Sequence, residues 1–438
     1  MRVSFLAICV VLGAGAPAAS AFAQSLETEL SGLASEHPVI KSAEAQVSAA
    51  QQGLRATLAP FLPTVEATGG NGYERISTPA FRATPEGPFD TDAENYAITL
   101  RENIFDGGRK FANRRAAHLQ LNVLDLTLTN TRQNILYEGA TAYINVLRQA
   151  ELVALTSQNG ENIRKQLNLE DERVRRGSGI SVDVLQAKSR LQFSLERFVA
   201  TRGALEEARA RYLQVYSHPP EQKGMTLPPP PDHLLPKTVD EAVAIALAEN
   251  AQVESADKRI DIGNEQRSAI NAEYYPSLDI VLQSKYERDF NGAPGIRRDK
   301  SAKVQATLTL FSGLSTQSRA AQAAYDTDAR RSDYQQTRRK VEEQTRIAWH
   351  SLQTALERVG LLENAVNIAS EVFTSRTKLR EAGKETVINV LDAENEVFSA
   401  RINYASALYD ARLAAYQLLL AIGRLEVEAV APGATAKP

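Results

Sequence analysis

The residues of this chain that could do chemistry are polar and charged side chains that follow two glycines. Gly177 and Gly383 stand at equivalent places in two similar halves of the sequence. Asp183 and Asn389 follow them by six positions each, and Asp392 comes one helical turn later. Side chains of these types bind cations and form ion pairs and hydrogen bonds.

No motif of an enzyme class accompanies these residues. The five histidines share no metal-ligand spacing, and the sequence contains no nucleophile elbow, phosphate-binding loop or dinucleotide fingerprint. The 50 basic and 53 acidic residues leave a net charge of −3, which argues against nucleic acid as a partner. We therefore predict a protein that is not an enzyme and holds no cofactor and no metal.

The two glycines belong to a longer pattern that the chain repeats at an offset of 206 positions, from 105 to 311. Residues 105–108 read Phe-Asp-Gly-Gly and residues 311–314 read Phe-Ser-Gly-Leu, and the same offset carries Tyr143 onto Trp349. No residue is gained or lost between these marks, although loops tolerate insertions at low cost. A constant length indicates a rigid rod that must reach a fixed distance.

Residues 1–23 have the features of a secretory signal peptide. Arg2 supplies a positive start, residues 5–12 an apolar core, and Ala21-Phe22-Ala23 a small-x-small cleavage site. The only cysteine, Cys9, lies in this segment. We therefore expect an exported chain without disulfides and without a cysteine to carry lipid. No later stretch of about 18 apolar residues predicts a transmembrane helix.

The distribution of proline permits very long helices. No proline occurs between Pro88 and Pro219, or between Pro294 and Pro432. Because a proline inside a helix costs about 3 kcal/mol, such gaps favour uninterrupted helices. A helix over residues 106–176 would be roughly 100 Å long.

The expected domain organisation is a pair of repeats, each with two strands followed by two helices. The first repeat occupies 24–218 and the second 237–424, with a proline-rich linker at 219–236 and a tail at 425–438. The strands are expected near residues 62–77, 95–105, 277–289 and 302–311. The helices are expected near residues 106–176, 180–216, 312–382 and 386–421.

The helical segments carry apolar residues at 4-3 spacing, the heptad pattern of supercoiled helices. In the second repeat this heptad stripe consists of Ala348, Leu352, Ala355, Val359, Leu362, Val366, Ala369 and Phe373. In the first repeat two such stripes run side by side, which suits a helix with a neighbour on each side, as in a ring. Periodicity alone leaves a solid bundle, a plain stalk and a hollow tube open.

The strand segments favour the hollow tube. Leu278, Ile280 and Leu282 alternate with polar residues, as do Val304 and Ala306. Over about ten residues this alternation is typical of outer-membrane barrel strands, although a half-buried soluble sheet shows it too. Four strands cannot close a barrel that conducts anything. Several chains must therefore contribute to one barrel.

These features together resemble the TolC family of outer-membrane channels, over about residues 25–424. The resemblance is carried by the cleaved signal, the two repeats, the Phe-x-Gly turn from strand into helix, and Gly-x5-[Asp/Asn]-Val-Leu-x-Ala at the helical turn. It implies a mainly α fold with a membrane β-barrel, in which a homotrimer forms a 12-strand barrel continued by a 12-helix α-barrel tunnel. It also implies a Gram-negative outer membrane with its lipid, a long periplasmic extension, a periplasmic adaptor protein and an inner-membrane transporter of the ABC or RND type.

The same resemblance places docking tips and a gate at the periplasmic ends of the helices. The docking tips would be Gly177, Gly179, Gly383 and Lys384, and the gate Asp183, Arg380, Glu385, Asn389 and Asp392. The family's entrance has two aspartate rings at the positions of Asn389 and Asp392, so only one ring keeps its charge here. The arginine of the family's polar latch is Glu385 here, and we hypothesise that Arg380 and Asp183 form the latch instead. Simple turn glycines and solvated surface charges are the alternatives.

The predicted function is a passive exit duct for secreted protein or small toxic compounds. A periplasmic coiled-coil adaptor is the alternative, but adaptors usually have one hairpin and an inner-membrane anchor or lipid. A coiled-coil filament is a third possibility. The missing lipid-bearing cysteine favours protein secretion by family analogy, and the sequence leaves the cargo and the transporter open.

Overall fold

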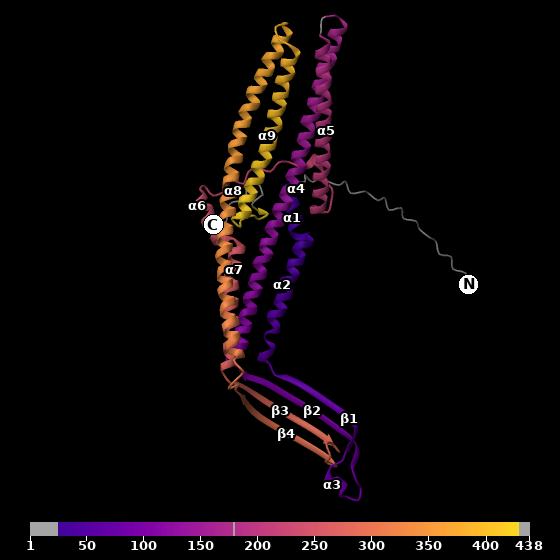
Figure 1. The fold of residues 1–438 in the computed structure, drawn as a ribbon, viewed down its shortest axis with the longest axis vertical. Coiled ribbons are helices and arrows are strands. Elements are labelled where there is room, and N and C mark those ends of the chain that lie inside the picture. Colours follow the sequence, from indigo (N-terminus) through magenta and orange to yellow (C-terminus); the bar gives the residue numbers. More distant parts are fainter. Residues whose placement is uncertain (1–24, 178–179, 429–438) are drawn as a thin grey trace, which may run out of the picture.

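The protein is a long helical rod with a four-stranded sheet at one end (Figure 1). The computed structural model describes residues 25–177 and 180–428. The expected signal peptide at 1–23, Gly179 and residues 429–438 of the expected tail lie outside the described residues. None of the described helices is both long enough and apolar enough to cross a membrane.

Two helices of equal length run along the rod. α4 (Arg109–Arg175) and α8 (Ser315–Glu381) contain 67 residues each, which is about 100 Å of helix. Both begin three residues after the expected positions, 106 and 312. The turns before them place Gly108 at φ 91° and Leu314 at φ 65°, and these left-handed conformations cannot belong to a right-handed helix.

Each long helix turns back into a second helix and forms a hairpin. α5 (Ser181–Tyr216) returns from α4, and α9 (Val387–Ala421) returns from α8 (Figure 1). The heptad stripe of α8 is buried at Ala348, Leu352 and Ala355 and half-buried from Leu362 to Phe373. The apolar repeat therefore packs each hairpin along its length.

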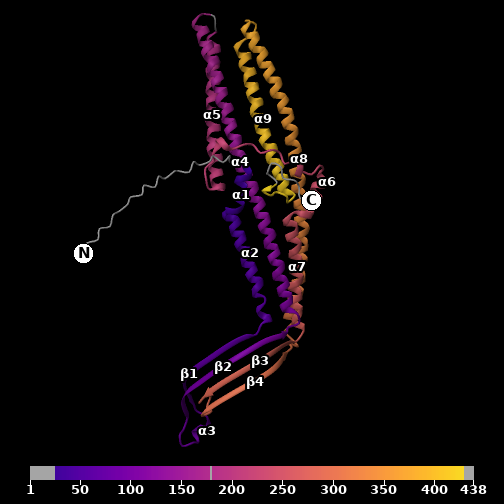
Figure 2. The same cartoon turned by 180° about the vertical axis from the view of Figure 1, so that it is seen from behind.

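Shorter helices, which the sequence analysis did not resolve, fill the half of the rod nearer the sheet. They are α1 (Leu26–Glu36), α2 (Pro38–Ala56), α6 (Val239–Glu249) and α7 (Ala251–Asn271). In both views α2 continues the line of α5 beside α4, and α7 continues the line of α9 beside α8 (Figures 1 and 2). The rod is thus four helices wide along most of its length. The linker holds two short 3-10 helices, η2 (Gln222–Gly224) and η3 (Asp232–Leu234).

Short 3-10 helices, η1 (Ala59–Phe61) and η4 (Ala272–Tyr274), lead from the rod into the sheet. The sheet is antiparallel in the order β1-β2-β3-β4. Its strands are β1 (Thr64–Ile76), β2 (Phe89–Phe105), β3 (Ser277–Arg288) and β4 (Ile296–Thr307), and the β1–β2 loop contains the short helix α3 (Pro79–Arg82).

Two strands differ from the expected ranges. β2 begins at residue 89, before the expected 95, and β4 occupies 296–307 where 302–311 was expected. Both extensions run through charged residues, such as Asp92 and Arg297, that interrupt the apolar alternation. Backbone hydrogen bonds continue there whatever the side chains are, so the register persists to the pair Arg288 and Ile296.

The two faces of the sheet differ in polarity. The register aligns Val65, Leu100 and Leu282 in one row, and aligns Glu66, Thr99 and Gln283 in the next row on the opposite face. The apolar face, which we call the outward face, is largely uncovered in the protomer. Within the described residues, β1 and β4 each pair along one side only. The sheet therefore has two free edges and one unpartnered apolar face.

The core lies where the short helices meet the long ones. Leu30, Tyr143 and Tyr416 are fully buried there. The Tyr143 hydroxyl donates to the carbonyl of Thr226 (3.1 Å) and accepts from the backbone N–H of the same residue (3.0 Å), which fastens the linker to α4. A Cβ on Gly139 would lie 2.5 Å from a methyl of Leu33, so the glycine permits the close approach of α1 to α4.

Candidate gate at the helical tips

Both hairpins end in a left-handed glycine. Gly177 has φ 75° and Gly383 has φ 70°, and the N–H of Lys384 donates to the carbonyl of Leu379 (2.9 Å), closing the C-terminus of α8. Nothing lies within 4 Å of a Cβ built on either glycine. Space beside the tips is therefore open to a partner, although the turn alone already requires glycine.

Arg380 connects the two hairpins. From α8, its Nη2 donates to both carboxylate oxygens of Glu170 on α4, at 3.0 and 3.1 Å, and its Nη1 donates to the carbonyl of Glu385 (3.1 Å). The Glu170 side chain is 4% exposed and that of Arg380 is 24% exposed. Arg173 also pairs with Glu170 at 3.1 Å. The Arg380–Glu170 contact is therefore a charge-assisted hydrogen bond shielded from most of the solvent.

The hypothesis that Arg380 pairs with Asp183 is wrong within the protomer. Among the described residues Asp183 forms no ion pair, and it lies half-buried in the first turn of α5. A carboxylate at that place interacts favourably with the N-terminal end of the helix dipole. Arg380 pairs instead with Glu170, a residue that the sequence analysis did not select.

Glu385 lies directly before Thr386, the N-cap of α9, and Asn389 lies in the first turn of that helix. The Asn389 side-chain amide and the Thr386 N–H both donate to Oε1 of Glu385. The hydrogen bond from Asn389, followed by that from Thr386, lowers the pKa of Glu385. Thr386 caps the helix by accepting from the N–H of Asn389 (3.4 Å). Asn389 stands where the resemblance would place one of two acids, and it forms hydrogen bonds with its own neighbours Glu385 and Thr386.

Asp392 makes a second connection between the hairpins. Its Oδ1 accepts from Nη2 of Arg190 on α5 at 2.5 Å, and both side chains are partly exposed. Arg190 was also missed. One signal was available, because Arg190 follows Asp183 by seven residues and so lies on the same face of α5.

Next to the Arg190–Asp392 pair, a layer of polar residues interrupts the apolar packing between the helices. Glu394 of α9 is 7% exposed, and its Oε2 has no partner among the described residues. Burial raises the pKa of Glu394, and a hydrogen bond with Asn162 opposes that shift. A cavity of about 380 Å³ lies beside it, lined in part by Asn159, Ser194 and Arg190.

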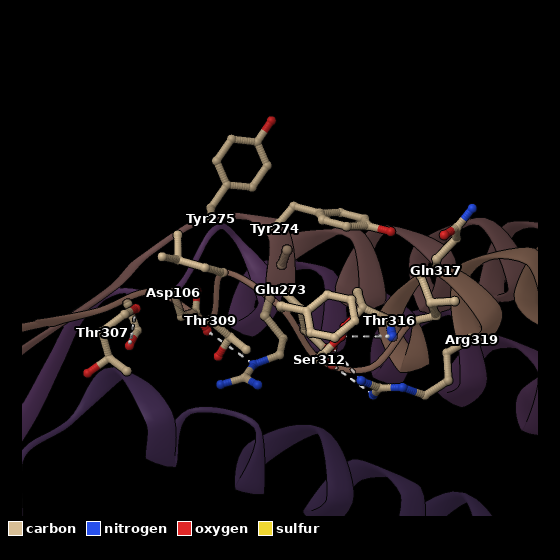
Figure 3. Close-up of a pocket in the computed structure, with 16 residues that line it drawn as sticks. Asp106, Glu273, Tyr274, Tyr275, Thr307, Thr309, Ser312, Thr316, Gln317 and Arg319 are labelled. Atoms are coloured by element: carbon tan, nitrogen blue, oxygen red, sulfur yellow. Dashed lines mark hydrogen bonds and ion pairs between the residues drawn. The ribbon is translucent and has the colours of Figure 1, made fainter.

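The junction between rod and sheet contains another polar cluster, which holds no predicted site residue. Figure 3 shows Glu273, Thr316 and Arg319 around a cavity of about 470 Å³. Burial would raise the pKa of Glu273, but hydrogen bonds from Arg319 and from Thr316 (3.0 Å) outweigh it and lower that pKa. These bonds tie η4, which follows α7, to the start of α8. Within residues 25–177 and 180–428, no group of three or more His, Cys, Asp or Glu side chains could hold a metal.

The comparisons with known proteins all indicate the same family. The family model described as outer membrane efflux protein matches residues 30–215 and 242–424. Among curated relatives, outer membrane efflux protein BepC of Brucella suis is 23% identical, covering 89% of this chain and 83% of its own. Outer membrane protein TolC of Escherichia coli is 22% identical over 89% and 80%. Alkaline protease secretion protein AprF of Pseudomonas aeruginosa is 23% identical over 80% and 75%.

Solved structures share the fold. The outer membrane protein VceC of Vibrio cholerae superposes with a TM-score of 0.77 at 18% identity, covering 91% of this chain and 96% of that one. The CmeC outer membrane channel of Campylobacter jejuni gives 0.78 at 13% identity, over 91% and 85%.

Proposed function

Because this chain belongs to the outer membrane efflux protein family and forms an exit duct, we propose that it acts as a homotrimer whose periplasmic mouth is held shut by Arg380–Glu170 and Arg190–Asp392. The family consists of transport ducts in the outer membrane with a periplasmic tunnel, and not of adaptors or enzymes. The observation that carries the proposal is the pair of charged contacts, each of which joins one hairpin to the other near the tips.

The free edges of the sheet support assembly of several copies. β4 of one copy can pair with β1 of the next, because both have unused backbone hydrogen-bonding groups on their outer sides. Three copies with four strands each would give the 12-strand barrel. Closure also removes the exposed edges, which would otherwise promote aggregation.

Exposed apolar stripes on the outer helices support the same assembly. α5 exposes Leu185, Val199 and Leu213 at multiples of seven residues, and α8 exposes Ile347, Leu361 and Ile368 in the same way. Residues seven apart share one face of a supercoiled helix. These stripes would form heptad contacts between α5 of one copy and α8 of the next, closing the helical tunnel.

The tips are the proposed contact with a periplasmic adaptor, which connects the duct to an inner-membrane transporter of the ABC or RND type. Gly177, Gly383 and Lys384 support this assignment because they are exposed at the ends of the hairpins, with open space beside both glycines. The names of the relatives include protease secretion for AprF and cobalt, zinc and cadmium resistance for CzcC of Cupriavidus metallidurans. Secreted protein and small toxic species therefore both remain proposed cargoes.

The gate would open when both charged contacts break. Arg190–Asp392 is partly exposed, and such a pair contributes at most about 1 kcal/mol. Arg380–Glu170 is more buried, so it would be the stronger of the two. Once they separate, the hairpin α8–α9 could move away from α4–α5 near the tips, where Asp183, Glu385 and Asn389 border the mouth.

Single-channel conductance in planar lipid bilayers tests this gate. The double variant Arg380→Gln/Arg190→Gln should conduct several times more current than the wild type, because both contacts are lost. Arg331→Gln is the matched control, since Arg331 lies on α8 but pairs with Asp328 within the same helix. Unchanged conductance in the double variant would refute the gate, and a mass other than three chains by light scattering would refute the trimer.

A further inference from the structure

Aromatic residues lie near both ends of the sheet, and those at the far end belong to its outward face. Near the rod, the rings of Tyr274 and Tyr275 project away from the backbone (Figure 3) and are exposed. Near the far end, Tyr96 lies opposite Tyr286 in the register, with ring centroids 6.2 Å apart. From Tyr275 to Tyr286 the strand rises roughly 36 Å, or about 28 Å across a bilayer at a tilt of about 40°. This is close to the height of the apolar band of an outer-membrane barrel.

At the far end, the same face carries a basic group on β3 and β4. Arg298 lies opposite Tyr286, with its guanidinium carbon 5.8 Å from the ring centroid. Lys300 lies opposite Ser284, two positions nearer the rod. Arg288 also points to this face, but Glu94 accepts a hydrogen bond from it at 2.6 Å. The positive charge thus lies at the boundary between the apolar band and the water outside the cell.

Arg298 and Lys300 are not neutralised within the protomer. Both are exposed, and neither forms an ion pair or hydrogen bond with another residue in the described part of the chain. Asp299, between them in sequence, points to the opposite face and pairs with Arg297 at 2.9 Å. The charges are therefore available to an anionic ligand at the membrane surface.

We propose that Arg298 and Lys300 bind the phosphate groups of the phosphorylated glycolipid of the outer leaflet. A guanidinium matches the geometry of phosphate oxygens, and an ammonium adds a point charge. Long basic side chains can lie along apolar surface and place their charge at the level of the headgroups, as Arg298 does along Tyr286. The acyl chains would cover the apolar band below. This site goes beyond export and rests only on the outer-membrane location.

A matched pair of double variants tests the site. Arg298→Gln/Lys300→Gln removes two charges from the outward face, and Arg297→Gln/Lys303→Gln removes two from the opposite face of the same strand. Each purified protein is titrated in detergent with lipid A bearing both phosphates, and binding is measured by native mass spectrometry. Near an anionic headgroup each lost charge should weaken binding about fivefold, so the outward variant should bind about twenty-five-fold more weakly. The control should bind like the wild type.

Further measurements distinguish a phosphate-binding site from a folding defect and from general attraction of lipid. Arg298→Lys/Lys300→Arg keeps the charge and should retain binding, which excludes a folding defect as the cause. Dephosphorylated lipid A should bind all proteins equally weakly, and millimolar inorganic phosphate should not compete. Equal binding of dephosphorylated lipid, competition by free phosphate, or an equal loss in the opposite-face control would each overturn the proposal. Conductance of Arg298→Gln/Lys300→Gln should match the wild type, so the site can fail while the duct stands.

Discussion

Glu170 and Arg380 are 210 positions apart in the chain, yet one arginine nitrogen donates to both oxygens of the carboxylate at 3.0 and 3.1 Å. The carboxylate is almost wholly buried between α4 and α8. Leaving one member of a buried ion pair alone is costly, because its charge then has neither water nor a partner. The contact therefore resists separation of the hairpins while both members are present.

Glu170→Gln should destabilise the protein more than Asp392→Asn does. The first change leaves Arg380 half-buried without its anion, a situation that costs about 3 kcal/mol or more. The second removes a partly exposed contact worth at most about 1 kcal/mol. Urea unfolding followed by circular dichroism measures both. A larger loss for Asp392→Asn would contradict the difference in burial on which the gate is argued.

Glu394→Gln should change how stability depends on pH. Burial raises the pKa of Glu394 in the folded protein above its ordinary value of 4.5, so the folded state keeps the proton to a higher pH than the unfolded chain. The stability from this residue is therefore complete below pH 4.5 and falls as pH rises through the higher folded value. The variant cannot lose this stability, because glutamine does not titrate. The difference in melting temperature, variant minus wild type, should therefore be more positive at pH 7.5 than at pH 4. A constant difference between the two pH values would contradict this.

Gly108→Ala should destabilise the start of α4, although a Cβ there meets no atom within 4 Å. Its φ of 91° is unfavourable for any residue with a side chain, and the cost should be about 1–2 kcal/mol. Gly53→Ala is the control, because Gly53 lies inside α2, also in open space, without a positive φ. That change should instead stabilise by up to about 1 kcal/mol. Thermal unfolding of both proteins gives the comparison, and equal shifts would be inconsistent with it.

Tyr143→Phe should cost about 1–3 kcal/mol. The fully buried hydroxyl bonds both the N–H and the carbonyl of Thr226, and its removal leaves those backbone groups without that partner. Tyr325→Phe, at an exposed position on α8, should have no measurable effect. Differential scanning calorimetry would detect the loss, and an unaltered Tyr143→Phe protein would mean that water replaces the hydroxyl.

The sequence predicted those features that local spacing determines. The turns from strand into helix before α4 and α8 and the helical turns at Gly177 and Gly383 follow from glycine and its neighbours, and the long helices follow from missing proline and heptads. The short helices α2 and α7 were not resolved, because their apolar residues are few and their packing depends on α4 and α8. The partners Glu170 and Arg190 were missed because nothing in the spacing shows which residues meet when separate hairpins pack together. The ends of β2 and β4 were misplaced because charged residues there obscure a pairing set by the backbone.

The equal lengths of α4 and α8 constrain how such a molecule can be altered. A heptad inserted into α4 alone would raise one tip by about 10 Å over the other and leave an uneven rim, with Glu170 two turns away from Arg380. The same insertion in both long helices and both returning helices would keep the rim level. A longer or shorter tunnel for a different envelope thickness therefore requires four coordinated insertions or deletions at matching heights. Any single change should leave the tips uneven and weaken their contact with the partner at the mouth.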